Sequence, residues 1–436
     1  MKQITLGLLG LGTVGGGLVN ILHHSAVDIE RKLGKGFRIE RIAVRDLSRP
    51  RNVDTQDIAL TDDPFTVVQD PNVEVVVELM GGTTLARDLV EQAIKNGKHV
   101  VTANKAMIAL YGNELFELAE KYQVQIYYEA SVAGGIPIIK ALREGLAANK
   151  IDWLAGIING TGNYILTEMK KPSADFDAVL KTAQKLGYAE ADPTYDVEGI
   201  DAAHKLTILA SLAFGIELSY SRVYTEGISH ISADDVRFAN SFGYEIKHLG
   251  IASRTEEGEY SLRVHPTLVP KTVLLADVNG VMNAVLIHGN HVGSTMYYGP
   301  GAGSGATASA VMADLMDLAR CWDAPYDAHL PALGYQLDQI DRDAIIANID
   351  AIDTAFYLRF LVQDHPGVLA RLSQTLADCD ISIEHLHQEP VDEGDFALVV
   401  MTTNVVNEAR FNEAMAILEG LDDVEGKVTK IRVSSF

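Results

Sequence analysis

Cysteine is almost absent from this sequence, which has only Cys321 and Cys379 in 436 residues. Two cysteines are too few for a disulfide framework or a zinc cluster, so we expect two buried structural thiols in a cytoplasmic protein. Long apolar runs are also missing, since none reaches the roughly 18 residues that predict a membrane span. Acidic residues outnumber basic ones, 59 to 36, and the net charge of −23 disfavours nucleic acid and anionic membranes as partners.

The N-terminus has one lysine followed by an apolar stretch, as a secretory signal does. Its regularly spaced glycines and its lack of a small-residue cleavage site argue against such a signal. The composition, with 47% hydrophobic and 22% charged residues, is that of a folded protein. A chain of this length exceeds one ordinary core, so two or three domains are expected.

A glycine-rich loop follows the first apolar strand, which is predicted at residues 3–9. The loop is Gly10-Leu11-Gly12-Thr13-Val14-Gly15, and an apolar-periodic helix follows it. A GxGxxG loop between a strand and a helix is typical of dinucleotide-binding domains. Glycine is needed because backbone N–H groups must approach a pyrophosphate closely, next to the positive end of the helix.

Strands and helices alternate over residues 1–135, which predicts an α/β Rossmann domain with a doubly wound parallel sheet. Further strands are expected at 37–46, 74–82, 99–105 and 124–130, and helices at 85–98 and 113–122. Right-handed crossovers place the loops after the strands on one edge of the sheet. That edge would carry the glycine loop, Arg45, Thr83 and Lys105.

The end of the second strand indicates the choice of cofactor. An acidic residue there binds a ribose 2′-hydroxyl, whereas an arginine accommodates a 2′-phosphate. The strand ends in Arg45 and Asp46, and Arg49 and Arg51 follow closely. The basic residues favour NADP, and Asp46 leaves NAD open.

Beyond residue 135 the alternation weakens, and residues 136–325 are predicted to form an α+β substrate and dimerisation domain. Its apolar strands, such as 153–160 and 281–289, have no nucleotide-binding glycines between them. A glycine-rich stretch and helix at 303–322 are expected to return to the nucleotide domain. Gly303 would then either lie close to the cofactor or form a flexible turn.

The stretch GYAEADPTYDVEGIDAAHK, residues 187–205, holds five carboxylates and ends in a lysine. With Ala183 it matches A-x3-G-[aromatic/aliphatic]-[small]-x2-D-P-x2-D-[aliphatic]-x-G-x-D-x3-K at every constrained position. In this pattern the chain resembles the homoserine dehydrogenases. The segments GLLGLGTVG, GGTTLA, VTANK and EASVAGGIPII are similar to other blocks of that family in the same order. The resemblance covers essentially the whole chain.

The resemblance implies reversible reduction of L-aspartate 4-semialdehyde to L-homoserine with NADPH or NADH, in threonine, methionine and isoleucine biosynthesis. Hydride transfer to an aldehyde leaves an alkoxide that needs a proton from a positioned acid. Lys105 and Lys205 are both candidates, because a lysine with a lowered pKa can do this work. Asp201 lies four residues before Lys205 on one predicted helix, where it can orient the ammonium or contact the substrate.

The implied substrate is a zwitterion, so its ammonium needs carboxylates. We expect Glu190 and Asp201 to bind it, with Asp196 in a secondary role and Glu198 solvated. The resemblance also implies that Gly187 contacts substrate and cofactor, and that Na⁺ binds near the hinge. The cation ligands carried over from the family are a glutamate and backbone carbonyls, at Glu129, Val132, Gly134 and Ile136.

The C-terminal part is predicted to be an acidic, lightly structured linker at 326–353 and a ferredoxin-like βαββαβ module at 354–436. The segment LVQDHPGVLARLSQTLADCDISIE resembles the ACT regulatory domains, whose strand-to-helix loop binds small amino acids. Asp364, His365 and Gly367 occupy that loop. The implied role is feedback control, with threonine as the leading effector; a purely structural or dimerising module is the alternative.

Three other functions are weighed against this prediction. An aspartate-semialdehyde dehydrogenase needs a thiolate for its thioacyl intermediate, and the two cysteines lie at a domain end and in the C-terminal module. Length disfavours an aspartokinase fusion, since the oxidoreductase pattern begins at residue 3. The intact candidate catalytic side chains disfavour a nucleotide- and amino-acid-sensing regulator without catalysis. The family implies a homodimer or homotetramer, which no sequence pattern indicates.

Overall fold

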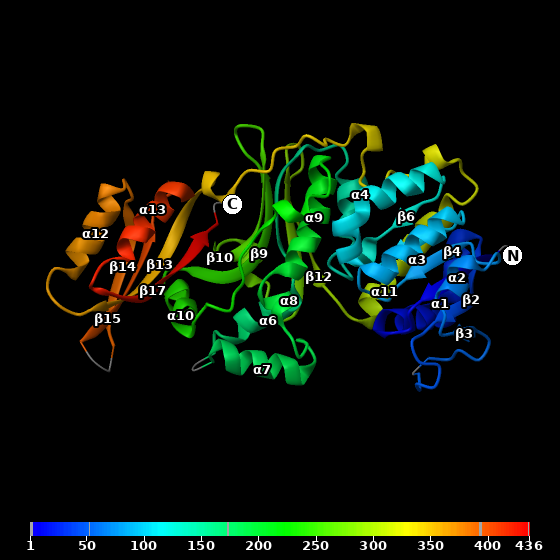
Figure 1. Ribbon diagram of the computed structural model, residues 1–436, viewed down its shortest axis with the longest axis horizontal. Helices are drawn as coiled ribbons and strands as arrows, with labels where there is room; N and C mark the ends of the chain where they lie inside the picture. The colour runs from blue at the N-terminus through cyan, green and yellow to red at the C-terminus, as the bar shows by residue number, and fades with distance from the viewer. Residues whose placement is uncertain (1–2, 52, 172–173, 392–394, 435) are drawn as a thin grey trace. The chain divides into compact units, whose positions relative to one another are not determined.

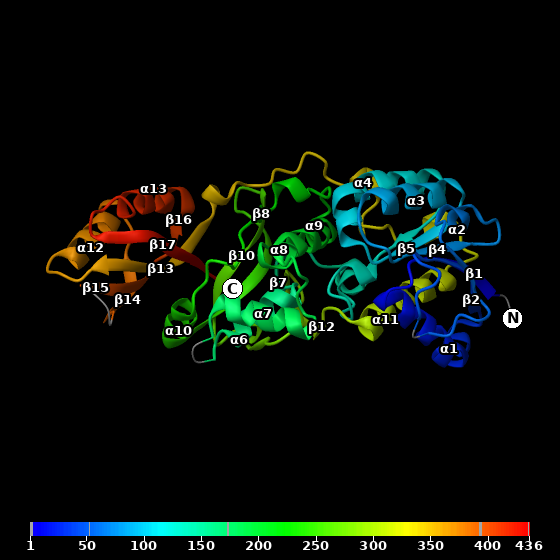
Figure 2. The ribbon, with the colours of Figure 1, turned by 60° about the horizontal axis from the view of Figure 1, so that its bottom comes forward.

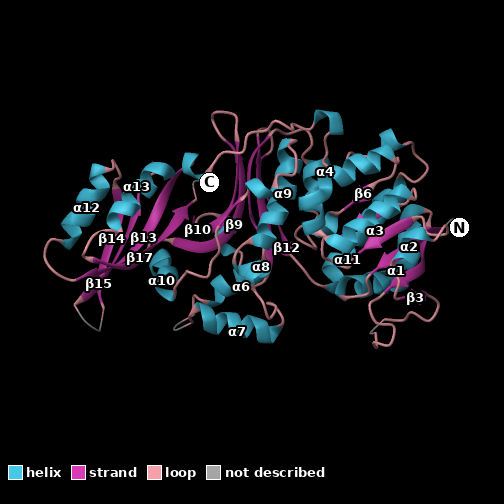
Figure 3. Cartoon of the chain, viewed as in Figure 1, coloured by secondary structure: helices cyan, strands magenta, loops and turns pink. Residues whose placement is uncertain are grey.

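The computed structural model describes residues 3–51, 53–171, 174–391, 395–434 and 436. These residues form two compact units, each built from segments far apart in the sequence. One comprises Met1–Leu154, His204–Ser221 and Asn283–Ala344, and the other comprises Ala155–Ala203, Arg222–Met282 and Ile345–Phe436. Figure 3 shows strands with helices against them in each unit. No helix in the described part of the chain has both the length and the apolar character that a membrane span requires.

The first unit contains a six-stranded sheet in which neighbouring strands are parallel, in the order β3-β2-β1-β4-β5-β6. The strands are β1 (Gln3–Leu9), β2 (Gly36–Ala43), β3 (Ala59–Thr61), β4 (Val75–Glu78), β5 (His99–Thr102) and β6 (Ile126–Tyr127). This order is that of a doubly wound dinucleotide-binding sheet, so the predicted Rossmann domain is confirmed. β3 was not predicted, because it is a short edge strand without an apolar face.

The helices of this sheet are α1 (Thr13–Leu33), α2 (Phe65–Gln69), α3 (Thr84–Lys95), α4 (Lys105–Lys121) and α11 (Ser304–Arg320). α1 packs against α11 and α3 packs against α4 (Figures 1 and 2). The fully buried Leu6 and Leu8 of β1 share one core with Val311 and Leu315 of α11. A helix from late in the chain therefore completes the nucleotide-binding core.

α4 begins at Lys105 rather than at residue 113, where the apolar periodicity placed its start. The cause is an N-cap, because Oδ1 of Asn104 accepts a hydrogen bond from the backbone N–H of Met107 at 3.1 Å. Such a cap starts a helix without needing an apolar pattern in the first turns. β2 also ends at Ala43, before the predicted end of this strand, which leaves Arg45 in the loop that follows.

The second unit contains strands in the order β9-β10-β17-β13-β15-β14. They are β9 (Tyr244–Arg254), β10 (Tyr260–Pro270), β13 (Asp353–Gln363), β14 (Ile383–Pro390), β15 (Phe396–Thr403) and β17 (Val424–Val433). Its helices are α6 (Gly160–Glu168), α7 (Phe176–Leu186), α8 (Thr194–Val197), α10 (Ala233–Ser241), α12 (Val368–Asp378) and α13 (Glu408–Leu418). β7 (Ile151–Ile157), α9 (Ile200–Phe214) and β11 (Met282–Gly289) each run from one unit into the other. β12 (Gly293–Pro300) follows β11.

The C-terminal βαββαβ module has the ferredoxin-like strand order β17-β13-β15-β14, with α12 and α13 packed together against it. The rings of Phe356 on β13 and Phe411 on α13 stack in its core. This predicted module is confirmed. It is not separate from the rest of the unit, however, because Thr267 and Leu268 of β10 pair in parallel with Arg432 and Val433 of β17.

Candidate active site

The three glycines of the loop between β1 and α1 are required for different reasons. Gly10 has φ +104°, and a Cβ there would lie 2.9 Å from the carbonyl oxygen of Leu79. A Cβ on Gly15 would lie 2.4 Å from the carbonyl oxygen of Gly10, so only glycine lets α1 approach β1 this closely. A Cβ on Gly12, the N-cap of α1, would meet nothing within 4 Å. The backbone at Gly12 is thus open to a ligand, as pyrophosphate binding requires.

The loops predicted to hold the cofactor leave the sheet at one edge. The last residue of β1, Leu9, pairs with Ala43 of β2 and with Glu78 of β4, and Glu78 pairs with Thr102 of β5. These paired strand ends are followed by the glycine loop, Arg45, Thr83 and Lys105. The sheet register therefore brings the predicted cofactor loops of this unit to a common edge.

Glu78 organises this edge, although it was not predicted to be a site residue. It is fully buried, and its Oε1 accepts from the backbone N–H groups of Met80 and Gly81 at 2.8 and 3.1 Å. Its Oε2 accepts from the hydroxyl of Thr102 at 2.6 Å. Burial raises the pKa of Glu78, and these hydrogen bonds oppose that shift. The available signal was an acidic residue at the end of an otherwise apolar strand.

Lys105 is placed by the residue before it. Asn104 caps α4 and also donates from Nδ2 to the carbonyl oxygen of Gly82 at 2.7 Å. This bond ties the loop before α3 to the first turn of α4, where Lys105 is half-buried. The lysine therefore stands on a constrained helix start rather than on a free loop.

In the second unit, two carboxylates of the 187–205 stretch meet on one amide. Nδ2 of Asn159 donates to Oδ1 of Asp196 at 2.7 Å and to Oδ2 of Asp201 at 2.9 Å. Asp201 is 4% exposed and lies in the first turn of α9. Lys205 follows one turn later on the same helix face and is half-buried.

Glu190 lies outside this carboxylate pair. Its side chain is exposed, and its backbone carbonyl accepts from Nε2 of Gln184 at 3.1 Å. Gly187 has φ +77° and forms the left-handed C-cap of α7, which gives it a structural role whatever it binds. The geometry thus groups Asp196 with Asp201 and leaves Glu190 on the surface of its loop.

Glu198, which was expected to be solvated, is half-buried and also has a structural partner. Its Oε1 accepts from the hydroxyl of Ser229 at 2.8 Å. A Cβ on Gly227 would lie 2.3 Å from its Oε2, so the side chain fills the space that this glycine leaves. The backbone carbonyl of Val197 accepts from the N–H of Ile228 at 2.9 Å. Glu198 therefore fastens the end of α8 to residues 227–229.

Three segments of the chain match family models. Residues 10–129 match the homoserine dehydrogenase NAD-binding domain, residues 137–316 match homoserine dehydrogenase, and residues 356–423 match the ACT domain. A homoserine dehydrogenase of Pseudomonas aeruginosa is 53% identical over 438 residues, with 100% of both chains covered. The chain belongs to the homoserine dehydrogenase family. That of Neisseria gonorrhoeae is 49% identical, again with 100% of both chains covered.

Solved structures agree with this assignment. A homoserine dehydrogenase from Thiobacillus denitrificans has a TM-score of 0.93 at 53% identity, covering 100% of this chain and 99% of that one. A hyperthermophilic archaeal homoserine dehydrogenase in complex with NADPH has a TM-score of 0.61 at 26% identity, covering 72% of this chain and 97% of that one. The predicted family, oxidoreductase activity and nicotinamide cofactor are confirmed, and the ACT domain of this homoserine dehydrogenase fits feedback regulation.

The carboxylate of Glu129, in the predicted cation hinge, is engaged by backbone. Its two oxygens accept from the N–H groups of Ile139 at 3.0 Å and Lys140 at 2.8 Å. Its own backbone N–H donates to Oδ2 of Asp314 at 2.8 Å. Burial raises the pKa of Glu129 to about 7. Among the residues that the structure describes, no cluster of three His, Cys, Asp or Glu side chains could hold a metal ion.

The predicted effector residues of the ACT domain line one open pocket of about 350 Å³. Asp364, His365 and Gly367 lie between β13 and α12, and Gln388 of β14 also lines the pocket. Nε2 of Gln388 donates to Oδ1 of Asp364 at 3.2 Å. Nε2 of His365 lies 3.0 Å from Oδ1 of Asp423. Gln388 was not predicted, because β14 is far from residues 364–367 in the sequence and reaches this pocket only through folding.

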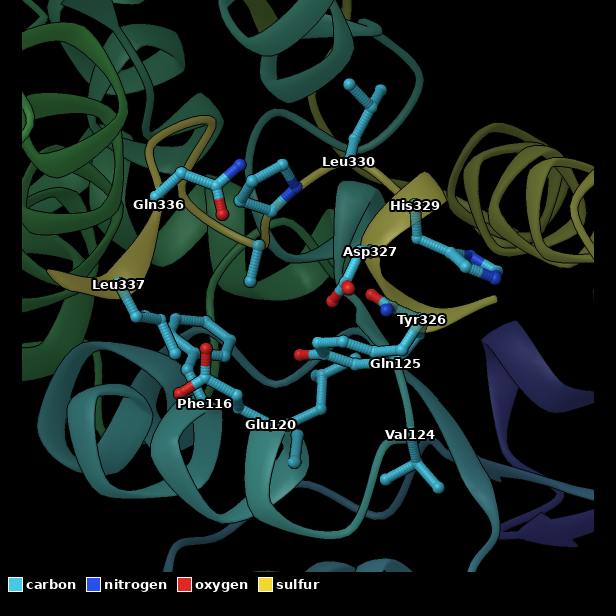
Figure 4. Close-up of a pocket in the computed structure, with 14 residues that line it drawn as sticks. Phe116, Glu120, Val124, Gln125, Tyr326, Asp327, His329, Leu330, Gln336 and Leu337 are labelled. Carbon is cyan, nitrogen blue, oxygen red and sulfur yellow. The ribbon is translucent and has the colours of Figure 1, made fainter. Parts of the chain in front are cut away.

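A smaller cavity of about 60 Å³ lies in the first unit between α4, β6 and the segment 326–337 (Figure 4). Phe116, Gln125, Tyr326 and Leu337 are among its lining residues. The described lining includes none of the predicted catalytic, cofactor or effector residues, so this cavity lies apart from the candidate site. Cys321 and Cys379 are both free thiols, and each is half-buried rather than buried as predicted.

Proposed function

We propose that this homoserine dehydrogenase interconverts L-homoserine and L-aspartate 4-semialdehyde through Lys205, Asp201 and Asp196. The observation that carries this assignment is the carboxylate pair on Asn159, one member of which, Asp201, lies one turn before Lys205 on α9. The nicotinamide coenzyme, when bound, exchanges a hydride with the carbon of the aldehyde or alcohol. Lys205 donates a proton to the aldehyde oxygen in reduction and removes it in oxidation. Lys105 is the alternative proton donor.

Asp196 and Asp201 hold the substrate ammonium in this proposal, since a cation is best bound by paired carboxylates with charge-assisted hydrogen bonds. Glu190 closes the ammonium site from the exposed loop, and Gly187 offers its backbone to substrate and cofactor. The side chain of Glu190 is exposed, so it has room to reach a bound substrate.

NADP is the preferred coenzyme in this proposal, held by the glycine loop, Arg45, Thr83, Lys105 and Gly303. Asp46, the residue that left NAD open, accepts at one oxygen from the N–H and hydroxyl of Ser48 at 2.8 and 2.6 Å. These bonds to Ser48 lower the pKa of Asp46 and engage the carboxylate in its own turn. Arg45, the residue before Asp46, is exposed and can pair with a 2′-phosphate.

The hinge is proposed to bind Na⁺ through backbone carbonyl oxygens. The Glu129 carboxylate is engaged by two N–H groups, so the fitting donors are the carbonyls of Glu129, Val132, Gly134 and Ile136. Ala133 and Gly134 have φ of +54° and +45°, and this sharp turn suits a loop that wraps its carbonyls around an ion. Oxygen donors suit a hard alkali cation.

Threonine is the proposed effector, bound in the ACT pocket with Asp364 and Gln388 as polar partners and the start of α12 near its carboxylate. The oligomeric state stays a prediction, a homodimer or homotetramer in the cytoplasm.

Steady-state oxidation of L-homoserine, followed by the absorbance of the reduced nicotinamide, tests the function. We expect turnover with both coenzymes and a higher kcat/KM for NADP⁺ than for NAD⁺. Absence of turnover with either coenzyme, for protein shown to be folded, would contradict the proposal. A higher kcat/KM for NAD⁺ would contradict only the assignment of Arg45.

A further inference from the structure

Asn159 makes three hydrogen bonds through one buried amide. It is 5% exposed and forms the N-cap of α6, where its Oδ1 accepts from the backbone N–H of Gly162 at 2.7 Å. Its Nδ2 donates to Asp196 and Asp201 at 2.7 and 2.9 Å. Neither carboxylate is near Asn159 in the sequence, since they lie 37 and 42 residues away. The amide thus joins the start of α6 to α8, which carries Asp196, and to the first turn of α9, which carries Asp201.

The orientation of this amide is fixed by its partners. An asparagine side chain has one acceptor oxygen and two N–H donors on one nitrogen. Gly162 presents a donor, so the oxygen must face it, and the two carboxylates present acceptors, so the nitrogen must face them. A flipped amide would lose all three bonds. Each N–H of Asn159 therefore has one carboxylate as its partner.

Two carboxylates on one NH₂ group are held at a defined separation. Like charges this close repel, and a carboxylate pair commonly relieves the repulsion by keeping a proton. Hydrogen bonds donated to the charged carboxylates favour their ionised form and so oppose the uptake of that proton. Because Asn159 is neutral, it supports both negative charges without cancelling either. A substrate that carries an ammonium group is best bound by two ionised carboxylates at a fixed separation.

The backbone around Asn159 is held on several sides. The hydroxyl of Thr161 donates to the carbonyl oxygen of Tyr188 at 2.6 Å. A Cβ on Gly162 would lie 3.3 Å from Oδ1 of Asn159, and a Cβ on Gly199 would lie 3.1 Å from Cε1 of His248. His248 on β9 also lies beside Gly162 and Gly199, and its Nε2 is 2.9 Å from the carbonyl oxygen of Glu226. Burial lowers the pKa of His248 to about 4. His248 therefore stays neutral at physiological pH.

We propose that Asn159 is a positioning residue, which holds Asp196 and Asp201 as an ionised, correctly spaced pair for the ammonium of homoserine. This inference rests on the proposed function, because those two aspartates are its proposed substrate ligands. Asn159 does not contact the reacting atoms in this proposal. It sets substrate affinity and the pH range in which the pair stays charged.

Asn159→Asp is the decisive variant. It keeps the shape of the side chain and the acceptor for Gly162, so the cap of α6 survives. It removes both donors and places a third carboxylate against the pair. We expect the KM for homoserine to rise about 10-fold or more, the scale of losing hydrogen bonds to charged groups, while the KM for NADP⁺ and the melting temperature change little.

The pH dependence of kcat/KM for homoserine should change only if Asn159 affects the ionisation of the two aspartates, and not if its role is purely structural. On acidification the carboxyl group introduced by Asn159→Asp takes up a proton and can donate one hydrogen bond. The homoserine affinity of this variant should therefore recover in part over the pH range in which the homoserine affinity of the wild type falls. Asn159→Ser, which caps α6 but cannot reach both carboxylates, should shift the acidic limb of kcat/KM for homoserine to higher pH. Asn159→Ser also provides the test of the positioning role if Asn159→Asp does not fold.

Asp175→Ala is the matched control. Asp175 caps α7 in the same unit by accepting from the N–H of Ala178 at 2.7 Å. Its loss should lower stability by the amount typical of a lost cap and leave the homoserine KM and the pH profile unchanged.

Asp201→Asn separates failure of this inference from failure of the proposed function. If Asp201→Asn raises the homoserine KM and folded Asn159→Asp behaves as wild type, the positioning role is wrong and the site assignment stands. If Asp201→Asn has a wild-type KM, the substrate assignment is wrong and the role of Asn159 falls with it. Kinetic losses in Asn159→Asp and Asn159→Ser that merely follow their melting temperatures, as for Asp175→Ala, would also overturn the positioning role.

Discussion

Nη1 of Arg432, on the last strand of the ACT domain, donates to Oε2 of Glu226 at 2.7 Å. Nε of the same guanidinium donates to Oε2 of Glu408 at 2.9 Å, and Nη2 donates to the hydroxyl of Tyr224 at 3.1 Å. Arg432 is 3% exposed, so two carboxylates share one buried cation. Burial favours the neutral form of Glu226, but Arg432 outweighs it and the pKa of Glu226 is lowered. The ACT domain is thus anchored by charge beside the point where β17 joins β10.

Arg432→Met should destabilise the protein strongly. It removes the cation that the buried Glu408 and the half-buried Glu226 share. Breaking a buried ion pair costs about 3–5 kcal/mol. Urea unfolding of both proteins measures the loss. Arg342→Met is the control, because Arg342 and Glu117 form an exposed pair whose loss should cost under about 1 kcal/mol. Equal losses in the two variants would show that the Arg432 cluster contributes no more than a surface pair.

Gly227→Ala should weaken homoserine binding, although Gly227 is not one of the proposed substrate ligands. The added Cβ would lie 2.3 Å from Oε2 of Glu198 and 2.8 Å from the carbonyl oxygen of Val197, so the end of α8 must move. We expect a stability loss of about 1–3 kcal/mol, as for overpacking, and a raised KM for homoserine. Gly145→Ala, where a Cβ meets nothing within 4 Å, is the control. A folded Gly227→Ala protein with unchanged KM would show that the position of α8 does not affect the substrate.

The fold was predictable where its signals are local. The loop Gly10–Gly15 between an apolar strand and a helix predicts the Rossmann domain, and alternating strands and helices predict the ACT domain. The pairing of Thr267 with Arg432 was not predictable, since it joins segments far apart in the sequence and leaves no local pattern. The start of α4 was missed because one capping side chain, Asn104, decides it rather than apolar periodicity.

The candidate site was predictable only as far as the family pattern reaches. Asp196, Asp201 and Lys205 are constrained positions of that pattern, and their roles stay predictions. No pattern in the sequence indicates the role proposed for Asn159, because that role depends on two carboxylates that lie near Asn159 only in the folded protein. Glu198 was assigned to solvent because an acidic residue in an acidic stretch usually is solvated. Its neighbour Gly227, whose missing side chain leaves room for the carboxylate, is far away in the sequence and is brought to it only by folding.

Asp314→Asn should make stability less dependent on pH. Asp314 is 3% exposed on α11, and burial followed by the charge of Glu129 raises its pKa well above the usual 3.8, although Arg143 opposes the shift. The folded protein therefore holds a proton that the unfolded chain releases above about pH 4, so the free energy of unfolding falls as pH rises from there. Glu129, with a pKa of about 7 against a usual 4.5, adds a fall between those values.

Thermal unfolding near pH 5 and near pH 8 tests this expectation. The melting temperature of the wild type should drop more between the two than that of Asp314→Asn, whose amide oxygen can still accept from the N–H of Glu129. Asp28→Asn, at an exposed position of α1, is the control and should keep the wild-type dependence. An unchanged pH dependence in Asp314→Asn would mean that Asp314 is ionised in the folded protein.

Threonine should inhibit the enzyme through the ACT pocket. Asp364→Ala and Gln388→Ala each remove a polar group that lines the pocket, so we expect the inhibitory threonine concentration to rise about 10-fold, with kcat unchanged. Point variants are preferable to truncation, because removing the ACT domain would also strip β17 from β10 and leave Glu226 without Arg432. Gln374→Ala, on the exposed side of α12, is the control. Inhibition that is unchanged in both pocket variants would place the effector elsewhere.

Lys205→Ala should lower kcat by about 10²-fold or more with little change in the KM for NADP⁺, since it removes the proposed proton donor. Lys105→Ala should instead weaken coenzyme binding, because Lys105 begins α4 at the edge of the nucleotide-binding sheet. Steady-state kinetics with both substrates varied separates the two effects. Lys205→Arg keeps the positive charge but lacks a readily released proton, so the KM for homoserine should stay near the wild-type value while kcat stays low. A near-normal kcat in Lys205→Ala together with a large loss in Lys105→Ala would move the proton transfer to Lys105.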